Sequence, residues 1–295
     1  MQRGRIGAPI EKPTSWWLAK LKQRKARMYE EHLDWSTPVV FDSPEEKEGC
    51  IRFFNAAFRA EESGLRQAHE LADEVAQWDP ELAETLRLYG DEEGWHRELL
   101  TEFMDKIGGE IRPMGKVTGT FYHVYGAAKH METIMLTNLM FETIGATTYR
   151  MALGRVKQKT IKQMLTILTR DESFHVPLNV HFIRQILKRT GPLRRAKLQG
   201  VYHLVYTALI GSAFASRRVA KPFDHISFKD LATAYAANLG RLFLNEPDLL
   251  LRPSETLLRL FGLRGEVLAA ERDDVTSVAA AEAAADRERV VVRAS

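Results

Sequence analysis

The sequence has a single cysteine among 295 residues, and this scarcity excludes several classes of structure. Cys50 alone cannot build an intramolecular disulfide framework, a cysteine-rich zinc module or an iron–sulfur cluster. The chain also has little excess charge of either sign, because its net charge is only +3, and we therefore expect no nucleic-acid partner. Any metal chemistry must rest on carboxylate and imidazole ligands.

Long hydrophobic runs are missing as well. The longest apolar stretch, Val201 to Ala215, is shorter than the ~20 residues that a membrane-spanning helix needs, and it contains His203. No continuous apolar segment of a secretory signal follows the basic residues of the first thirty positions. We therefore expect a cytoplasmic protein without a transmembrane span.

What the sequence does contain is a clear set of helix boundaries. Ser43, Pro44 and Glu46 form a cap with a proline at the first helical position, and Asp79 with Pro80 repeats this pattern. Glycines and prolines end the helices that these caps begin. The four long helices are expected at about 44–77, 80–107, 127–153 and 157–188, with a crossover at 108–125.

This order of short link, long crossover and short link predicts an all-α four-helix bundle, in which the second pair of helices packs against the first. Extra helices are expected at both ends. The predicted organisation is an N-terminal arm at 1–43 with a basic amphipathic helix at 14–33, the bundle at 44–190, accessory helices at 191–262 (about 195–218, 228–244 and 254–261), and a disordered or loosely helical tail at 263–295.

Two copies of one short motif, Glu-x-x-His, lie on the second and fourth of these helices. Glu93 precedes His96 in EEGWHRELL, and Glu172 precedes His175 in DESFHVPLN. Residues three apart on a helix project from one face, so each pair can bind one metal ion. Both faces are otherwise apolar, and polar groups on a core-facing stripe are costly unless they are paired or coordinated.

The first and third helices should then each supply a carboxylate. Glu142 is the candidate on the third helix. On the first helix, Glu61 is preferred because phenylalanines precede it by three and seven residues, whereas arginines flank its neighbour Glu62. Glu62 remains the alternative ligand.

The resulting pattern is a twofold repeat of four carboxylates and two imidazoles: Glu61, Glu93 and His96, then Glu142, Glu172 and His175. This is a ligand set for two iron ions, with manganese as an alternative in one or both positions. Glu92 and Asp171 directly precede the motif glutamates and can accept the remaining N–H of a ligand histidine, while Tyr89 and Tyr149 are candidate hydrogen-bond donors. His69 remains an alternative source of a third imidazole ligand. His181 is expected to point away from the site, and His123 and His130, near the crossover, are not assigned to the site.

With these residues, the chain resembles the ferritin-like di-iron superfamily over about residues 44–190. EEGWHRELL is similar to the corresponding segment of acyl-carrier-protein desaturases, and RDESFH is similar to these and to the aerobic magnesium-protoporphyrin ester cyclases. The small subunit of class I ribonucleotide reductase has a radical tyrosine four residues past its first ligand histidine. The corresponding position here is Leu100, which disfavours that role.

The resemblance implies an oxygen-dependent di-iron oxidoreductase: a hydroxylase, desaturase or N-oxygenase acting on a small or acyl-type organic substrate. A ferroxidase or iron-handling protein is the alternative, although the hundred or so residues after the bundle favour an enzyme. With one cysteine and no flavin motif, electrons must come from an external ferredoxin or reductase. The basic helix could dock such a donor; a solvated helix or a peripheral membrane contact is the competing interpretation, and a homodimer remains open.

Overall fold

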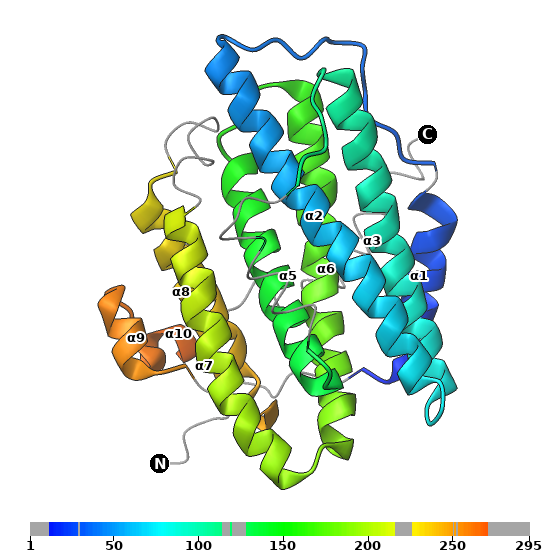
Figure 1. Ribbon diagram of the computed structural model, residues 1–295, viewed down its shortest axis with the longest axis vertical. Coiled ribbons are helices and arrows are strands. Elements are labelled where there is room, and N and C mark those ends of the chain that lie inside the picture. The colour runs from blue at the N-terminus through cyan, green and yellow to red at the C-terminus, as the bar shows by residue number, and fades with distance from the viewer. Residues whose placement is uncertain are drawn as a thin grey trace.

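Most of the described helices are long and lie side by side, roughly along the long axis of the molecule (Figure 1). A computed structural model describes residues 12–28, 30–113, 119, 128–215, 226–249, 251 and 253–270, and these residues contain no β-strand. The elements are α1 (Thr14–Met28), α2 (Pro44–Val75), α3 (Pro80–Lys106), α5 (Met131–Leu153), α6 (Lys159–Arg189), α7 (Pro192–Ala215), α8 (Phe228–Asn245), the 3-10 helix η3 (Pro247–Leu249), α9 (Glu255–Leu260) and α10 (Gly265–Ala270). None of the helices in this described part combines the length and hydropathy that crossing a bilayer requires.

Four of these helices form the predicted bundle. α2 packs closely along α3, and α5 packs closely along α6, with the two pairs facing each other (Figure 1). The caps expected from the sequence begin the first pair: the Ser43 side chain accepts from the Glu46 N–H at 3.1 Å, and Asp79 accepts from the Leu82 N–H at 3.0 Å. The all-α bundle architecture is thereby confirmed.

The third helix begins later than the sequence suggested. It starts at Met131 rather than near 127, because residues 128–130 are not helical and His130 has the extended backbone of an N-terminal cap position. Most of the predicted crossover, residues 114–118 and 120–127 with His123, lies outside the described residues.

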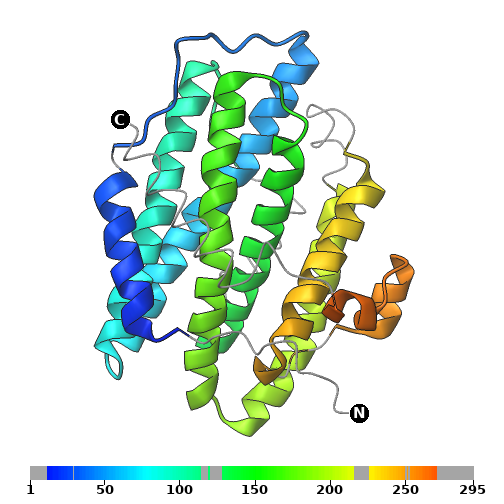
Figure 2. The ribbon, with the colours of Figure 1, turned by 180° about the vertical axis from the view of Figure 1, so that it is seen from behind.

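The accessory helices flank the bundle on opposite sides. α1 lies along α3 on one side, while α7 and α8 pack on α5 on the other, with α9 and α10 outside α8 (Figures 1 and 2). α10 lies inside the segment expected to be a disordered or loosely helical tail, and its Leu268 is buried. The accessory region therefore extends to at least residue 270, beyond the predicted boundary at 262; residues 271–295 lie outside the described part.

The bundle core is divided into two apolar clusters with a polar layer between them. One cluster includes Leu82, Leu86, Met135 and Phe182, and the other includes Phe54, Phe103, Met164 and Leu168. The charged residues predicted to bind metal come from positions between these two sets on each of the four helices. The apolar layers exclude water from both ends of that polar layer.

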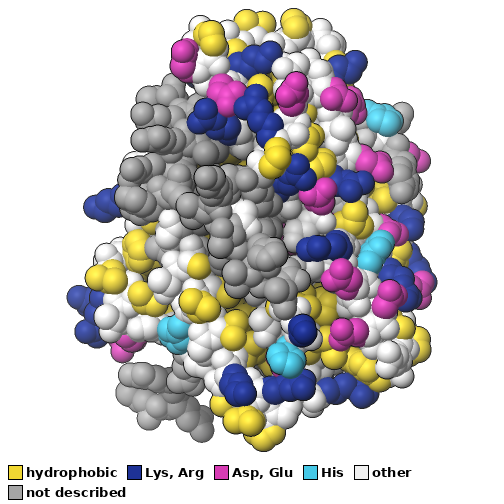
Figure 3. All heavy atoms as spheres, in the orientation of Figure 1, with side chains coloured by type: hydrophobic (Ala, Val, Ile, Leu, Met, Phe, Trp, Pro, Cys, Tyr) yellow, Lys and Arg dark blue, Asp and Glu magenta, His cyan; other side chains and the backbone are white. Residues whose placement is uncertain are grey.

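Charged side chains on the surface are mixed in sign. On the face seen in Figure 3, Lys and Arg side chains alternate with Asp and Glu over α2 and α3. Surface pairs such as Arg52–Glu48 at 2.8 Å and Arg87–Asp73 at 2.9 Å contribute to this mixture. The described side chains on this face therefore do not form a field of one sign.

Gly90 and Gly94, one turn apart on α3, differ in how closely α2 approaches them. A Cβ at Gly90 would lie 2.6 Å from His69 Cδ2 and 3.0 Å from Ala68 Cβ, whereas a Cβ at Gly94 would meet nothing closer than 3.5 Å. We expect Gly90→Ala to lower the free energy of unfolding by about 1–2 kcal/mol through overpacking. Gly94→Ala should raise it by about 0.5–1 kcal/mol, because alanine is the better helix former.

Urea denaturation followed by circular dichroism measures both changes. Equal effects of the two substitutions would contradict the close approach of α2 to α3 at Gly90.

Candidate metal centre

The six predicted ligand residues converge in the polar layer at the middle of the bundle. Each is buried, with exposed fractions from 0% to 8%. Their ligand atoms fall into three overlapping groups in which every atom lies within 4.8 Å of the others. The groups are Glu93 with His96 and His175, Glu61 with His96 and Glu172, and Glu142 with Glu172 and His175.

The geometry distinguishes between the two adjacent glutamates of α2. Glu61 is 2% exposed, and its Oε2 lies 3.3 Å from His96 Nδ1. Glu62 points away from the cluster, is 44% exposed, and accepts a hydrogen bond from Arg59 at 2.7 Å. Glu61 is therefore the glutamate of α2 that can reach a metal ion.

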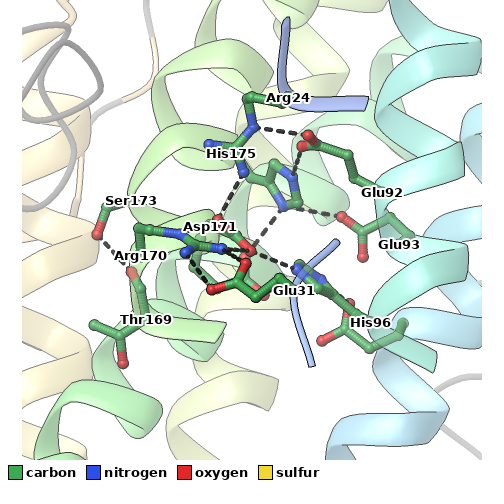
Figure 4. Close-up of polar contacts among 12 residues, drawn as sticks. Arg24, Glu31, Glu92, Glu93, His96, Thr169, Arg170, Asp171, Ser173 and His175 are labelled. Atoms are coloured by element: carbon green, nitrogen blue, oxygen red, sulfur yellow. Dashed lines mark hydrogen bonds and ion pairs between the residues drawn. The ribbon is translucent and has the colours of Figure 1, made fainter. Parts of the chain in front are cut away.

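Each histidine of the cluster is held between an inner and an outer carboxylate. His96 donates from Nε2 to Asp171 Oδ2 at 3.1 Å, and His175 donates from Nε2 to Glu92 Oε2 at 2.9 Å (Figure 4). Both Nδ1 atoms therefore face the cluster centre, where His175 Nδ1 lies 3.0 Å from Glu93 Oε1. This is the ring orientation that a metal ligand needs, and the outer carboxylates are the two that the sequence indicated.

The two tyrosines also reach the inner carboxylates. Tyr89 donates its hydroxyl to Glu142 Oε1 at 2.6 Å, and Tyr149 donates to Glu61 Oε1 at 3.2 Å. Each tyrosine therefore fixes one oxygen of a candidate ligand and leaves the other directed at the centre.

The remaining histidines stay away from the cluster. His69 is at the surface, with Nε2 3.3 Å from Asp91, so it does not supply a third imidazole. His181 is buried beside Trp17 and shares a hydrogen bond with Thr14 at 3.0 Å. His130 is exposed before α5, and Leu100 is fully buried in the apolar cluster.

Arg24 of α1 is the site residue that the sequence interpretation missed. It is only 5% exposed and forms ion pairs of 2.7 Å with both Glu92 and Asp171. A periodic pattern could have revealed it, because Trp17, Leu21, Arg24 and Met28 are the buried residues of α1 and recur at helical spacing.

Other cations of α1 also bind acids of this chain. Lys22 pairs with Glu84, and Lys25 pairs with Asp91, both at 2.7 Å and both on α3. The basic residues that were interpreted as a docking face for an acidic partner therefore serve, in these three cases, to attach α1 to the bundle.

The pKa values of the inner acids differ among themselves. Burial and the neighbouring Glu142 raise the pKa values of Glu93 and Glu172 well above the usual range. Burial also raises the pKa of Glu142, but the neighbouring Glu172 and His175 and the hydrogen bond from Tyr89 outweigh it and lower that pKa to about 2. The metal-free cluster thus relieves repulsion between its carboxylates by holding protons.

The two histidines and the outer carboxylates have pKa values that favour their charged forms. Burial lowers the pKa of His96, but hydrogen bonds to Asp171 and Glu61 raise it to about 10; the pKa of His175 is raised in the same way, chiefly by Glu93. Burial raises the pKa of Asp171, but Arg170 and Arg24 outweigh it and bring that pKa well below its usual range. Without metal both imidazoles are cations, and the outer acids stay ionised.

Several buried polar atoms at the centre have no hydrogen-bond partner in the part of the chain that the structure describes. They are Glu93 Oε1, Glu142 Oε2, Glu172 Oε2 and His175 Nδ1, so the 3.0 Å contact between His175 and Glu93 is an ion pair without hydrogen-bond geometry. Unsatisfied buried atoms are costly, and here they converge on one point. Hard oxygens with two imidazoles suit iron or manganese, so the residues present fit a two-metal site.

A pocket leads to the carboxylate side of the cluster. Its empty volume is about 390 Å³, part of which is open to solvent. The space available to the centre of a water molecule inside it is about 40 Å³. The four inner glutamates line it, together with Ala60, Ser63, Gly64, Asn138, Phe141, Gly145 and Tyr149. Both histidines are absent from this lining, so the pocket opens on the side opposite Arg24.

Metal loading should release protons. Ligand atoms must lose their protons to bind metal, and Glu93, Glu172, His96 and His175 all have raised pKa values in the metal-free protein. The apparent affinity for Co2+ should therefore rise between about pH 6 and about pH 8. Calorimetry in buffers of different ionisation enthalpy measures the release, and a binding heat independent of the buffer would contradict it.

Two glycines of the pocket form a matched pair, each three residues after a glutamate. A Cβ at Gly64 would lie 3.0 Å from Glu93 Oε2, whereas a Cβ at Gly145 would make only ordinary contacts, 3.7 Å from Glu172. We expect Gly64→Ala to weaken Co2+ binding about tenfold by displacing Glu93, as is typical when a ligand loses its orientation. Gly145→Ala is the control and should bind within about twofold of the unmodified protein. Competition with a chromogenic chelator measures both affinities, and the opposite ranking would contradict the geometry.

The comparisons with known proteins agree with this arrangement. Residues 52–179 match the Rubrerythrin family model, a segment that includes all six clustered residues. A search of curated proteins finds no match to the chain. Residues 52–179 are therefore a rubrerythrin-type domain of the ferritin-like di-iron carboxylate superfamily.

Proposed function

We propose that this di-iron redox domain is an oxygen-dependent oxidoreductase, a hydroxylase, desaturase or N-oxygenase, that acts on a small organic substrate. The observation that carries the proposal is the pocket beside the four inner glutamates, on the face that the histidines leave free. Its inner space is large enough for O2 or a few waters, while its solvent-open part can admit a larger molecule.

The proposed ligands divide between two metal positions. Glu61 with His96 would hold one iron ion, and Glu142 with His175 would hold the other. Glu93 and Glu172 would lie between these two positions. The ligand atom of Glu93 is grouped with those of both histidines, and Glu172 belongs both to the group that contains His96 and to the group that contains Glu142 and His175. Manganese in one or both positions remains an alternative cofactor. When bound, two ferrous ions supply electrons for the reduction of O2.

The chain's own residues orient these ligands and control the protons around them. Tyr89 and Tyr149 each hold one inner glutamate by a hydrogen bond, which limits how that carboxylate can turn. Glu93 and Glu172 are the acids whose raised pKa values allow them to hold a proton beside the pocket. The apolar clusters above and below keep bulk water out.

Electrons for repeated turnover must come from outside the chain, since the sequence has one cysteine and no flavin motif. We propose a ferredoxin or a reductase as the donor. An iron-oxidising or iron-handling role is the competing function, and the acidic lining of the pocket favours it because four glutamates also attract Fe2+.

Metal analysis of the purified protein tests the proposed site. We expect about two iron ions per chain, and far fewer in a Glu93→Ala/His175→Ala variant, because two of the six candidate ligands are lost. Glu62→Ala is the matched control, since Glu62 lies next to Glu61 but points to the surface. Equal iron contents in all three proteins would contradict the assignment of the ligands.

The reaction itself is tested by anaerobic loading with Fe2+ followed by O2, with small hydrocarbon, amine and acyl-thioester compounds as probe substrates. Oxidised organic product, formed only in the presence of an electron donor, supports the oxidoreductase. Continued oxidation of added Fe2+ with growth of a ferric mineral, and no organic product, supports the iron-handling role instead. Failure of the loaded protein to consume O2 would contradict both.

A further inference from the structure

Arg24 is a buried cation on the otherwise apolar face of α1. The other buried residues of this helix are Trp17, Leu21 and Met28, which pack into the two core clusters. A buried guanidinium is costly unless charged partners surround it. Lys22 and Lys25 already attach α1 to α3 through ion pairs at the surface. Attachment of α1 alone therefore does not explain why Arg24 is buried.

The guanidinium bridges two helices of the bundle. Its Nε donates to Glu92 Oε1 on α3, and its Nη2 donates to Asp171 Oδ1 on α6, both at 2.7 Å (Figure 4). Its flat face lies over the ring of Phe174, with 4.4 Å from Cζ to the ring centroid. The fixed fork of donors in arginine suits two carboxylates at once, which the single ammonium of lysine cannot match.

Each of these carboxylates uses its other oxygen to hold a histidine. Glu92 Oε2 accepts from His175 Nε2 at 2.9 Å, and Asp171 Oδ2 accepts from His96 Nε2 at 3.1 Å. One continuous chain of hydrogen bonds thus runs from His96 through Asp171, Arg24 and Glu92 to His175. Arg24 is the link that joins the two outer carboxylates.

We propose that Arg24 is a positioning residue that orients both histidines toward the two-metal site. Helix α1 then contributes to that site through Arg24. The inference rests on the proposed function, because it assigns Arg24 a role toward the metals that the histidines would bind. With Arg24 removed, Glu92 and Asp171 are two buried anions that no longer share a cation, and their hold on the imidazoles loosens.

The two histidines should not respond equally. Asp171 keeps a second cation, Arg170, whose Nε and Nη2 donate to it at 2.7 Å and 2.9 Å. Glu92 has Arg24 as its only arginine partner among the described residues. Loss of Arg24 should therefore disturb His175, the partner of Glu92, more than His96.

The test compares Arg24→Gln with Lys25→Gln, the same kind of change at the next residue of α1. Lys25→Gln removes an ion pair to α3 without touching the outer carboxylates. Histidine-ring 15N spectra of the metal-free proteins, assigned with single His→Gln variants, report the protonation and hydrogen bonding of each ring nitrogen. Co2+ titrations report affinity and the ligand-field spectrum.

We expect Arg24→Gln to shift the ring signals of His175 most, to change the Co2+ spectrum, and to weaken Co2+ binding by about 10–100-fold, the range typical for groups that orient metal ligands. Lys25→Gln should leave the ring signals in place and bind Co2+ within about twofold of the unmodified protein. If Arg24→Gln has unmoved ring signals and unchanged Co2+ affinity, Arg24 only attaches the helix and the proposal is overturned.

A second variant keeps the test decisive if Arg24→Gln does not fold. Arg24→Lys retains the buried charge but can satisfy only one carboxylate well, so it should fold and still show the shift at one histidine. Ring signals identical to those of the unmodified protein would overturn the proposal here too. The spectra of metal-free protein do not require metal binding, so failure of the di-iron proposal is seen separately, as an unmodified protein that binds no Co2+.

Discussion

The burial of six carboxylates in the middle of one helical bundle is the constraint on which the rest of the structure depends. Glu61, Glu93, Glu142 and Glu172 form an inner set, and Glu92 and Asp171 form an outer one, all at most 8% exposed. Such a density of negative charge cannot persist away from water unless cations or protons balance it. The outer pair has Arg24 and Arg170. The inner four match the charge of two divalent ions, and the metal-free protein uses imidazolium groups and carboxyl protons in their place.

The two sides of the site therefore carry different charged groups. Arginines and histidines occupy the side that α1 covers, and the glutamates face the pocket on the opposite side. Small residues, Gly64 and Gly145, keep that second side open, since each stands one turn after an inner glutamate. A molecule that enters the pocket therefore meets the carboxylates first. On the histidine side, hydrogen bonds and ion pairs connect side chains of three helices, α1, α3 and α6.

Much of this could be predicted from local patterns. The phase of Glu61 against Phe54 and Phe58 distinguished it from Glu62, and the paired caps fixed the starts of α2 and α3, because both depend on residues within one or two turns. The role of Arg24 could not be predicted in that way. The helical spacing of the buried residues of α1 can mark Arg24 as buried, but its partners are 68 and 147 residues away, so the acids that it binds are identified only when the fold brings α1 against α3 and α6. The position of α10 could not be predicted for a similar reason: the sequence allowed a loosely helical tail there, and the packing of α10 on α8 depends on a helix that lies about twenty residues earlier in the chain.

The repeat that made the site recognisable does not make its halves equal. Each half supplies two glutamates, a histidine and an outer acid, yet the surroundings differ. Asp171 is bound by two arginines and Glu92 by one, and Tyr89 lies closer to Glu142, at 2.6 Å, than Tyr149 does to Glu61, at 3.2 Å. The elements that break the symmetry, α1 and the Arg170–Glu31 pair, have no counterpart in the other half among the described residues. Because ligand basicity follows such outer contacts, the two proposed metal positions have unequal electrostatic environments even though their proposed ligands are of the same types.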